Sequence, residues 1–235
     1  MDRFRYTILL PLLCLLFSAC VEYDALPFTG KTLPRKSGYT TGVTNDWVYF
    51  NLRTGEVFNA SGVGHDIKEG EQHDRTDWDL AFCGYVMRTN SGTSGIGQGG
   101  AADLGYGQYK KWEKVSQLPQ NLEWTLDDKT VSVTMSQNDW NKYLIANGLD
   151  FNANPWFDPN NGPAKTKTHA NPLLSQAMSF AGPPPVYTPS YHTYVVRTAD
   201  GKRYFKLQII SWYDANVEIG DEGGRMSYYC DELLP

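Results

Sequence analysis

A run of glycines that follows a strongly β-like segment limits the folds open to this 235-residue chain. Gly95, Gly97 and Gly100 have the G-x-G-x-x-G spacing of a dinucleotide-binding turn. Such a turn needs an α-helix that opens at its last glycine, but Gly105 and Gly107 stand where that helix would continue. We therefore predict an irregular β-segment that binds no nucleotide and lets backbone segments approach closely.

The rest of the chain is predicted to form mainly antiparallel strands. Residues 77–89 alternate between two sets of side chains, which predicts one strand with Trp78, Leu80 and Phe82 on the same face. Residues 191–213 predict two strands joined by an Asp-Gly turn, a strong hairpin signal. Further strands are predicted over residues 46–52, 56–61, 131–135 and 225–233.

Helical signals are few. One helix is predicted with Ser136 as its N-cap and with Asn147 and Gly148 at its C-terminal end. A second short helix is predicted over residues 173–179, and the many Asn and Pro residues over 151–173 predict a loop or irregular region. The expected fold class is all-β, as a single domain with one or two short helices.

The N-terminus has the pattern of a bacterial lipoprotein signal. Two arginines, an apolar run and the small residues before Cys20 predict a signal peptide over residues 1–19 and a lipidated Cys20. The alternatives are an ordinary signal peptide and a short membrane anchor, but the apolar run is short for a membrane span. Residues 20–44 predict a flexible tether, and residues 45–235 the folded domain. We expect a lipid-anchored protein of the outer membrane, exposed at the cell surface.

Composition and motifs argue against several function classes. The formal net charge is −5 and no Lys/Arg run is present, which argues against nucleic-acid binding. Ser94 does not stand in a nucleophile motif, and the four histidines lack the spacing of a zinc site, so we expect no enzyme. Cys83 and Cys230 are open to two interpretations, a disulfide or two buried thiols in separate strands.

Two blocks of sequence stand out: Trp78 to Ala81 with the glycine segment over residues 88–101, and the hairpin over residues 187–201. Together they resemble the HmuY family of haem-binding outer-membrane lipoproteins. In that family a W-D-[ILM]-A strand leads into an R-x-N-x-G-x-S-G-x-G-x-G-G-A segment, and these patterns match residues 78–81 and 88–101. A later hairpin of the family, Y-x-x-S-x-x-x-[FY]-[VI]-V-R-x-x-D-G, matches residues 187–201. The resemblance spans roughly residues 45–233, and the lipoprotein signal agrees with it.

The resemblance implies a hand-like β domain that grips one haem (iron protoporphyrin IX) between loops, with two axial ligands that are histidine or methionine. The nearest donors to the family's ligand regions are Met135 and Met178, with His169 in reserve. An ungapped match places Phe180 or Pro183 at the second position, and neither can coordinate iron. Four residues are expected to wall the haem pocket: Trp140, Tyr143, Phe180 and Tyr187.

The family resemblance also implies the biological role. Such proteins capture haem, often from host haemoproteins, and pass it to a TonB-dependent outer-membrane transporter. A second hypothesis is a binding module on the same fold that no longer holds haem and takes another porphyrin or a protein partner. A third, an extracellular hydrolase, would need a catalytic cluster that the sequence does not show.

Overall fold

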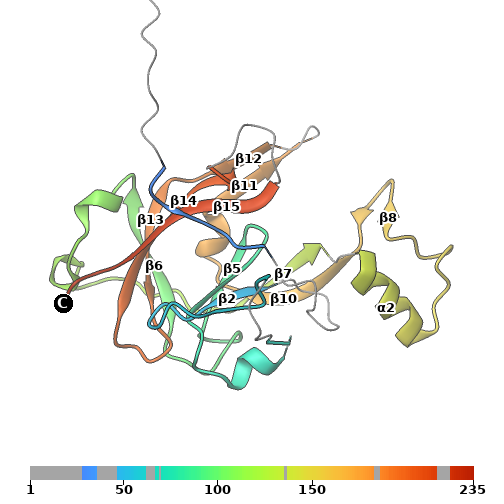
Figure 1. Ribbon diagram of the computed structural model, residues 1–235, viewed down its shortest axis with the longest axis horizontal. Coiled ribbons are helices and arrows are strands. Elements are labelled where there is room, and N and C mark those ends of the chain that lie inside the picture. Colours follow the sequence, from blue (N-terminus) through green and yellow to red (C-terminus); the bar gives the residue numbers. More distant parts are fainter. Residues whose placement is uncertain are drawn as a thin grey trace, which may run out of the picture.

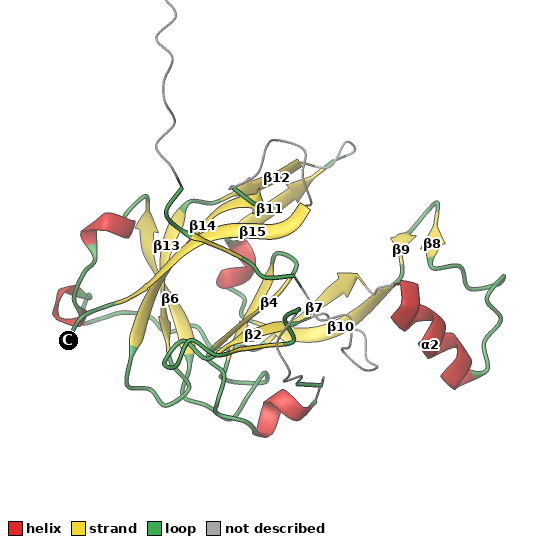
Figure 2. Cartoon of the chain, viewed as in Figure 1, coloured by secondary structure: helices red, strands yellow, loops and turns green. Residues whose placement is uncertain are grey.

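A computed structural model describes residues 28–35, 47–61, 67–68, 70–134, 137–182, 186–215 and 223–235. Within these ranges the strands form a five-stranded sheet, a four-stranded sheet and three two-stranded ribbons (Figure 1). Figure 2 shows how strands dominate over helices, which confirms the all-β prediction. The pairings between these strands are antiparallel.

The five-stranded sheet contains the three C-terminal strands of the chain. The predicted hairpin around the Asp-Gly turn is confirmed, because its two strands flank Gly201, whose φ is +73°. The predicted closing strand pairs with the second of them. In spatial order the sheet consists of β1 (Lys31–Thr32), β15 (Gly223–Glu232), β14 (Tyr204–Tyr213), β13 (His192–Arg197) and β6 (Gly100–Tyr106).

β1 lies inside the segment that the sequence predicts as tether. It pairs with β15, and Leu33, which follows it, is buried in the core. The packed part of the chain therefore includes residues N-terminal to position 45, although the predicted domain boundaries themselves stay a prediction.

No helix in the described part of the chain is long and apolar enough to cross a membrane.

The four-stranded sheet corrects one strand prediction. Residues 77–89 form two strands instead of one, because the chain turns back at Gly84, which has a φ of +56°. Both strands are buried on both faces, so the alternation of apolar residues gives no sign of the turn between them. In spatial order the sheet consists of β3 (Val57–Phe58), β2 (Val48–Phe50), β4 (Leu80–Cys83) and β5 (Val86–Thr89).

Side chains from both sheets form the core. Leu80 and Phe82 point into the largest cluster, whereas Trp78 packs in a second cluster on the other face of the four-stranded sheet. The prediction that these three share a face is wrong for Trp78, because it precedes β4 and is outside the regular alternation of that strand. Cys230 lies in the first cluster and Cys83 in the second, and no disulfide joins them.

A long arm leaves the four-stranded sheet, with its helix at the far end (Figure 1). The arm consists of β7 (Lys129–Thr134), α2 (Gln137–Asn147), β8 (Phe157–Asp158), β9 (Gly162–Pro163) and β10 (Lys165–Ala170). β7 and β10 pair along their lengths, and the buried residues Thr168 and Ala170 anchor the base of this ribbon against the core.

The arm confirms the helix prediction and corrects the loop prediction. The helix ends at Asn147, and Gly148 follows it with a φ of +63°, as expected for a C-terminal glycine. The predicted N-cap, Ser136, lies outside the described residues. The predicted loop over residues 151–173 contains three strands, of which the longest, β10, was missed because its polar sequence KTKTHA gives no hydrophobic signal.

A third element, the β11–β12 ribbon, lies beside β14 (Figure 1). It consists of β11 (Met178–Ala181) and β12 (Val186–Pro189). The short helix predicted over residues 173–179 is only a 3₁₀ turn at Leu174–Gln176, after which the chain becomes extended. Three more 3₁₀ turns occur at Glu71–Asp74, Tyr109–Lys111 and Val115–Gln117.

Candidate functional site

Four aromatic side chains from three hairpins meet beside the β11–β12 ribbon, and we call them the aromatic cluster: Tyr85, Phe180, Tyr187 and Trp212. The rings of Tyr187 and Trp212 are stacked, with centroids 4.2 Å apart and planes inclined by 12°. Phe180 packs against Tyr187 at 5.1 Å and is 52% exposed. The cluster therefore presents aromatic surface to solvent above the core.

Backbone irregularities bring these rings together. The register between β14 and β15 shifts on either side of Ser211, and the second shift, between Ser211 and Tyr213, includes Trp212. Such bulges turn a side chain away from the regular alternation. Gly84 forms the turn that carries Tyr85, and a Cβ atom at this glycine would lie 3.6 Å from the Trp212 ring. Phe180 and Tyr187 face each other directly across the ribbon. The site thus depends on a bulge, a turn and the pairing of the β11–β12 ribbon, which meet in space.

The Tyr187 hydroxyl group has a shifted pKa. Burial raises the pKa of Tyr187, and the neighbouring phenols of Tyr85 and Tyr213 raise it further. The Tyr187 hydroxyl therefore stays protonated at neutral pH and can donate a hydrogen bond to an acceptor.

Of the three side chains predicted as iron ligands, the structure places only Met178 next to the aromatic cluster; Met135 lies outside the described residues. Met178 is 2% exposed and lies in the core cluster against which Tyr187 and Trp212 pack. His169 is exposed on β10, opposite Thr130, and so belongs to the arm. No group of three or more His, Cys, Asp or Glu residues able to hold a metal ion occurs in the described part of the chain.

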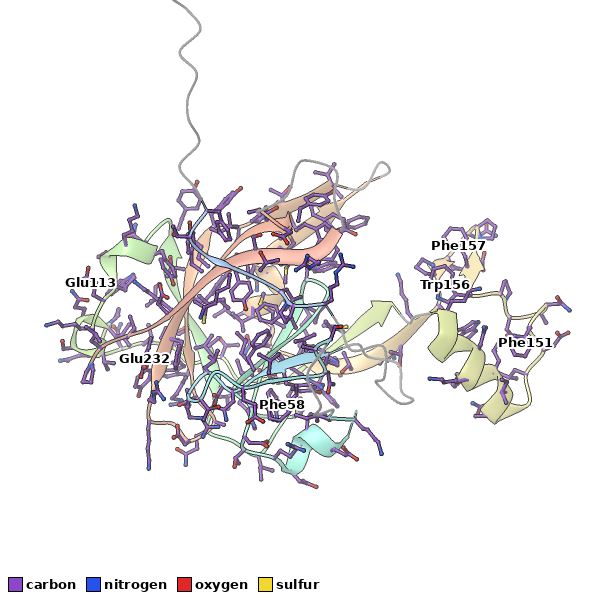
Figure 3. The ribbon with its side chains drawn as sticks, viewed as in Figure 1. Phe58, Glu113, Phe151, Trp156, Phe157 and Glu232 are labelled. Carbon is purple, nitrogen blue, oxygen red and sulfur yellow. The ribbon has the colours of Figure 1, made fainter. Side chains whose placement is uncertain are left out.

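The other two predicted wall residues lie on the arm. Trp140 and Tyr143 stack on each other in α2 at 5.3 Å, and the Trp140 indole N–H donates to the Asn154 carbonyl. Figure 3 shows further aromatic residues nearby, with Phe151, Trp156 and Phe157 at the end of the arm. The structure thus divides the four predicted wall residues equally between the aromatic cluster and the arm.

Sequence reasoning missed Tyr85 and Trp212. Each has a local signal, since Tyr85 follows a glycine within a strand-like segment and Trp212 ends a long β-pattern. Their meeting was not predictable, because it depends on a turn and a bulge that the sequence pattern does not reveal.

Comparisons with known proteins identify the chain's relatives. The sequence profile of the family described as HmuY protein matches residues 43–230. The chain belongs to the HmuY family. A search of curated proteins found no match.

Solved structures resemble this HmuY-family chain at low sequence identity. The apo form of PinO from Porphyromonas gingivitis superposes with a TM-score of 0.53 at 15% identity, covering 88% of this chain and 98% of that one. An assigned HmuY-like haem-binding protein from Bacteroides vulgatus gives 0.49 at 18% identity, over 80% and 85%. The apo HmuY analog of Tannerella forsythia gives 0.48 at 18% identity, over 90% and 99%. The likeness to PinO supports the fold.

The glycine segment of the HmuY motif encloses Asn90. A Cβ atom added at Gly95, Gly97 or Gly99 would lie within 2.7 Å of this asparagine. Its carbonyl oxygen accepts the Gly97 N–H at 2.9 Å, and its amide donates to two backbone carbonyls on the Trp78 side of the turn. The strand β6 follows this segment, where a dinucleotide-binding turn would be followed by a helix, which confirms the predicted absence of a helix here.

Arg88 and Thr89 of the same segment are buried as well, as is Asp127 beside them. Arg88 is fully buried, with its guanidinium 4.0 Å from the centre of the Trp47 ring, and burial lowers its pKa to about 9. Asp127 accepts hydrogen bonds from the Thr89 backbone N–H at 2.8 Å and from its hydroxyl at 2.6 Å. Burial raises the pKa of Asp127. These groups hold the fold together and are closed to a ligand.

Proposed function

We propose that this chain binds haem at the cell surface, with one face of the porphyrin against the aromatic cluster, and passes it to an outer-membrane transporter. Membership of the HmuY family supports haem as the ligand class. The observation that carries the proposal within this chain is the stack of Tyr187 on Trp212 with Phe180 exposed beside it. A flat, apolar macrocycle gains dispersion and burial against such a surface.

The polar atoms of the cluster also suit haem, which has two propionate groups. The raised pKa of Tyr187 keeps its hydroxyl protonated, so that it can donate to a carboxylate. Tyr85 and Tyr213 lie close enough to Tyr187 to influence that pKa, so their hydroxyl groups fall in the same region. The haem propionates would be held by these phenols, while the rings of the cluster exclude water from the macrocycle.

The first experiment is a haemin titration of the mature protein, followed by its Soret absorbance. We expect a shifted Soret band that saturates, and a fall in affinity of about 10- to 30-fold in Trp212→Ala, because a stacking surface is lost. Trp124→Ala is the matched control, since Trp124 is also half-buried but packs against Arg197 and Tyr204. A wild-type titration without a Soret shift would overturn the proposal.

The iron ligands need their own test, for which Met135 and Met178 remain the proposed pair. Met178 is packed in the core, so Met178→Leu is preferable to alanine because it keeps the volume and removes only the sulfur. We expect Met178→Leu and Met135→Leu each to change the spectrum of the ferric complex. If both leave it unchanged, the methionine assignment is wrong while haem binding itself stands.

A second candidate function is the binding of a porphyrin without a need for iron, or of a protein partner. The burial of Met178 favours it, since a thioether within the core offers little to a ligand on the surface. Protoporphyrin IX, which has the same ring and carboxylates but no iron, separates the candidates. Equal affinity for haemin and protoporphyrin IX supports recognition of the macrocycle alone, whereas a preference for haemin supports iron coordination.

The surface anchor and the delivery step are proposals that rest on Cys20 and on the family. We expect Cys20→Ser to abolish labelling by a radioactive fatty acid and to move the protein from the membrane fraction to the soluble one. Haem-loaded protein is then mixed with membranes that contain or lack a TonB-dependent transporter. Loss of the Soret signal from the protein only in the presence of the transporter supports delivery.

A further inference from the structure

The strand β1 fixes the N-terminal segment to the five-stranded sheet. β1 pairs antiparallel with β15, and Leu33, which follows β1, donates its N–H to the Met226 carbonyl at 2.8 Å. The Leu33 side chain is buried in the core. A Cβ atom at Gly30 would lie 2.7 Å from the Tyr228 carbonyl oxygen, so this glycine lets the two chain segments approach closely. The domain is therefore attached to the N-terminal segment at β1.

The position of β1 limits the distance between the domain and a lipid anchor at Cys20. Phe28, the first residue that the structure describes, stands eight positions after Cys20. A chain spans at most ~3.6 Å per residue, so Phe28 lies within about 29 Å of an anchored Cys20. A tether that reached residue 45 would permit about 90 Å. The side of the domain that carries Phe28 is therefore held close to the bilayer.

Aromatic rings connect this attachment point to a basic segment, which comprises residues 109–114 with the sequence YKKWEK. The Phe28 ring packs on that of Tyr229, with centroids 5.3 Å apart. Tyr229 also packs against Tyr109, again at 5.3 Å, and Tyr109 begins the 3₁₀ turn Tyr109–Lys111. The basic segment thus lies next to the place where the chain leads back to Cys20.

The basic segment presents positive charge and apolar surface to solvent, although the whole chain has a net charge of −5. Three of its side chains are exposed lysines: Lys110, Lys111 and Lys114. They stand against one acidic residue of the segment, Glu113, and the neighbouring Asp231, which accepts a hydrogen bond from the Tyr109 hydroxyl at 2.8 Å. Leu234 is 59% exposed beside the segment, since its N–H donates to the Glu113 carbonyl at 2.9 Å.

A bilayer with anionic headgroups suits this combination of lysines and apolar side chains. Each lysine near such a surface strengthens binding by about 5-fold, and apolar side chains gain by burial at the headgroup boundary. Three lysines alone would give weak binding, but an anchor that keeps them within reach of the bilayer makes weak contacts effective. Figure 3 shows Glu113 at the opposite end of the molecule from Phe151, which lies on the arm.

We propose that residues 109–114, together with Phe28 and Leu234, form the face of the domain that lies against the bilayer in which the lipid anchor is embedded. The inference rests on the proposed anchor at Cys20 and is independent of haem binding. It gives the domain an orientation, in which the lysines contact anionic headgroups and the arm points away from the membrane.

The test uses the full lipidated chain in vesicles of phosphatidylethanolamine and phosphatidylglycerol that carry a nitroxide quencher on their headgroups. A thiol-reactive fluorophore is attached at Lys110→Cys or, as the matched control, at Lys142→Cys, an exposed lysine of α2 on the arm. Cys83 and Cys230 are buried, so the label reacts with the introduced cysteine. We expect several-fold stronger quenching at position 110 than at position 142.

Charge reversal separates the basic segment from the anchor as the cause of this proximity. In the chain labelled at position 110, Lys111→Glu with Lys114→Glu should lower the quenching several-fold, because the anionic headgroups then repel the segment. Added salt should lower it in the wild-type background. Lys165→Glu with Lys167→Glu makes the same change in net charge at exposed positions of β10 and should have no effect.

Two kinds of failure are distinguishable. A chain that incorporates no fatty acid at Cys20 would defeat the proposed anchor and this inference with it. A lipidated, vesicle-bound chain with equal quenching at positions 110 and 142, or with equal effects of the two charge reversals, would overturn this inference alone.

Discussion

Asn90 and Trp212 lie at the centres of two regions that are packed in opposite ways, one closed to solvent and one partly open to it. The Asn90 side chain is fully buried, its oxygen and nitrogen are both hydrogen-bonded, and glycines make room for it. The Trp212 ring is half-buried and stacks on Tyr187 beside the exposed Phe180. The first region contains one of the two sequence blocks that carry the family resemblance, and the second contains surface that a ligand can reach.

The difference shows why a diagnostic motif need not be a binding site. Glycines around a buried amide are hard to replace, because any Cβ atom would overlap Asn90. Aromatic rings on a surface tolerate other rings, so the ligand-facing region leaves a weaker pattern in the sequence. The first region should therefore respond to mutation by unfolding, and the second by loss of binding.

The largest effect is expected at Asn90. Asn90→Ala removes the partners of the Gly97 N–H and of the Arg75 and Trp78 carbonyls, and each buried group left unpaired costs about 1–3 kcal/mol. We expect the free energy of unfolding to fall by about 3 kcal/mol or more in urea denaturation. Asn160→Ala, at an exposed turn, is the control and should change little.

For the comparison to hold, the folded fraction of Asn90→Ala must still bind haemin with wild-type affinity. A specific loss of affinity in a fully folded variant would show that the motif region takes part in binding.

The pH dependence of stability tests the same buried region. Burial raises the pKa of Asp127 in the folded state. In the unfolded chain this carboxyl loses its proton at about pH 4, so between that pH and the raised pKa the unfolded chain binds fewer protons than the folded chain. The Asp127 contribution is therefore present in full below that pH, and is lost as pH rises through the raised pKa. The free energy of unfolding of Asp127→Asn should not show this decrease as pH rises. Asp128→Asn, the exposed neighbour, should retain it.

A smaller effect is expected when only hydroxyl groups of the aromatic cluster are removed. Tyr187→Phe keeps the stack on Trp212 and should change the unfolding free energy by less than about 1 kcal/mol. Because the phenol is proposed to donate to a propionate, haemin affinity should fall several-fold, while the affinity for haemin dimethyl ester should not change. Equal losses for both ligands would contradict the proposed role of the hydroxyl.

The smallest effect is expected on the arm. Tyr143 is exposed in α2 and stacks on Trp140, so Tyr143→Ala should lower the unfolding free energy by less than about 1 kcal/mol. If the arm contributes a wall of the haem site, affinity should fall by a few-fold in the same titration. A decrease as large as that of Trp212→Ala would place the main binding surface on the arm.

Much of the fold was predictable because local signals decide it. The Asp-Gly hairpin, the helix that ends before Gly148 and the glycine segment that excludes a helix each follow from the conformations that those residues favour. The turn at Gly84 escaped prediction because the strands on both sides are buried on both faces. β10 escaped because its stability comes from pairing with β7 and not from its own composition.

The candidate site was less predictable than the fold. Phe180 and Tyr187 were identified through the family resemblance, and the structure places them opposite each other. The position of Trp212 depends on a register shift between β14 and β15, and no local pattern predicts where a strand pair gains an extra residue. Methionine ligation at Met135 and Met178 stays a prediction.

Among the strands that the structure describes, the β11–β12 ribbon forms its own two-stranded sheet and is not hydrogen-bonded into either main sheet. A two-stranded ribbon is marginally stable by itself in water, so this one depends on its contacts with Trp212 and the core. Its amide protons should therefore exchange with solvent through local opening, well before those of β13 and β14. A ligand that stacks on Phe180 and Tyr187 would slow that exchange, so the site becomes rigid as it is filled.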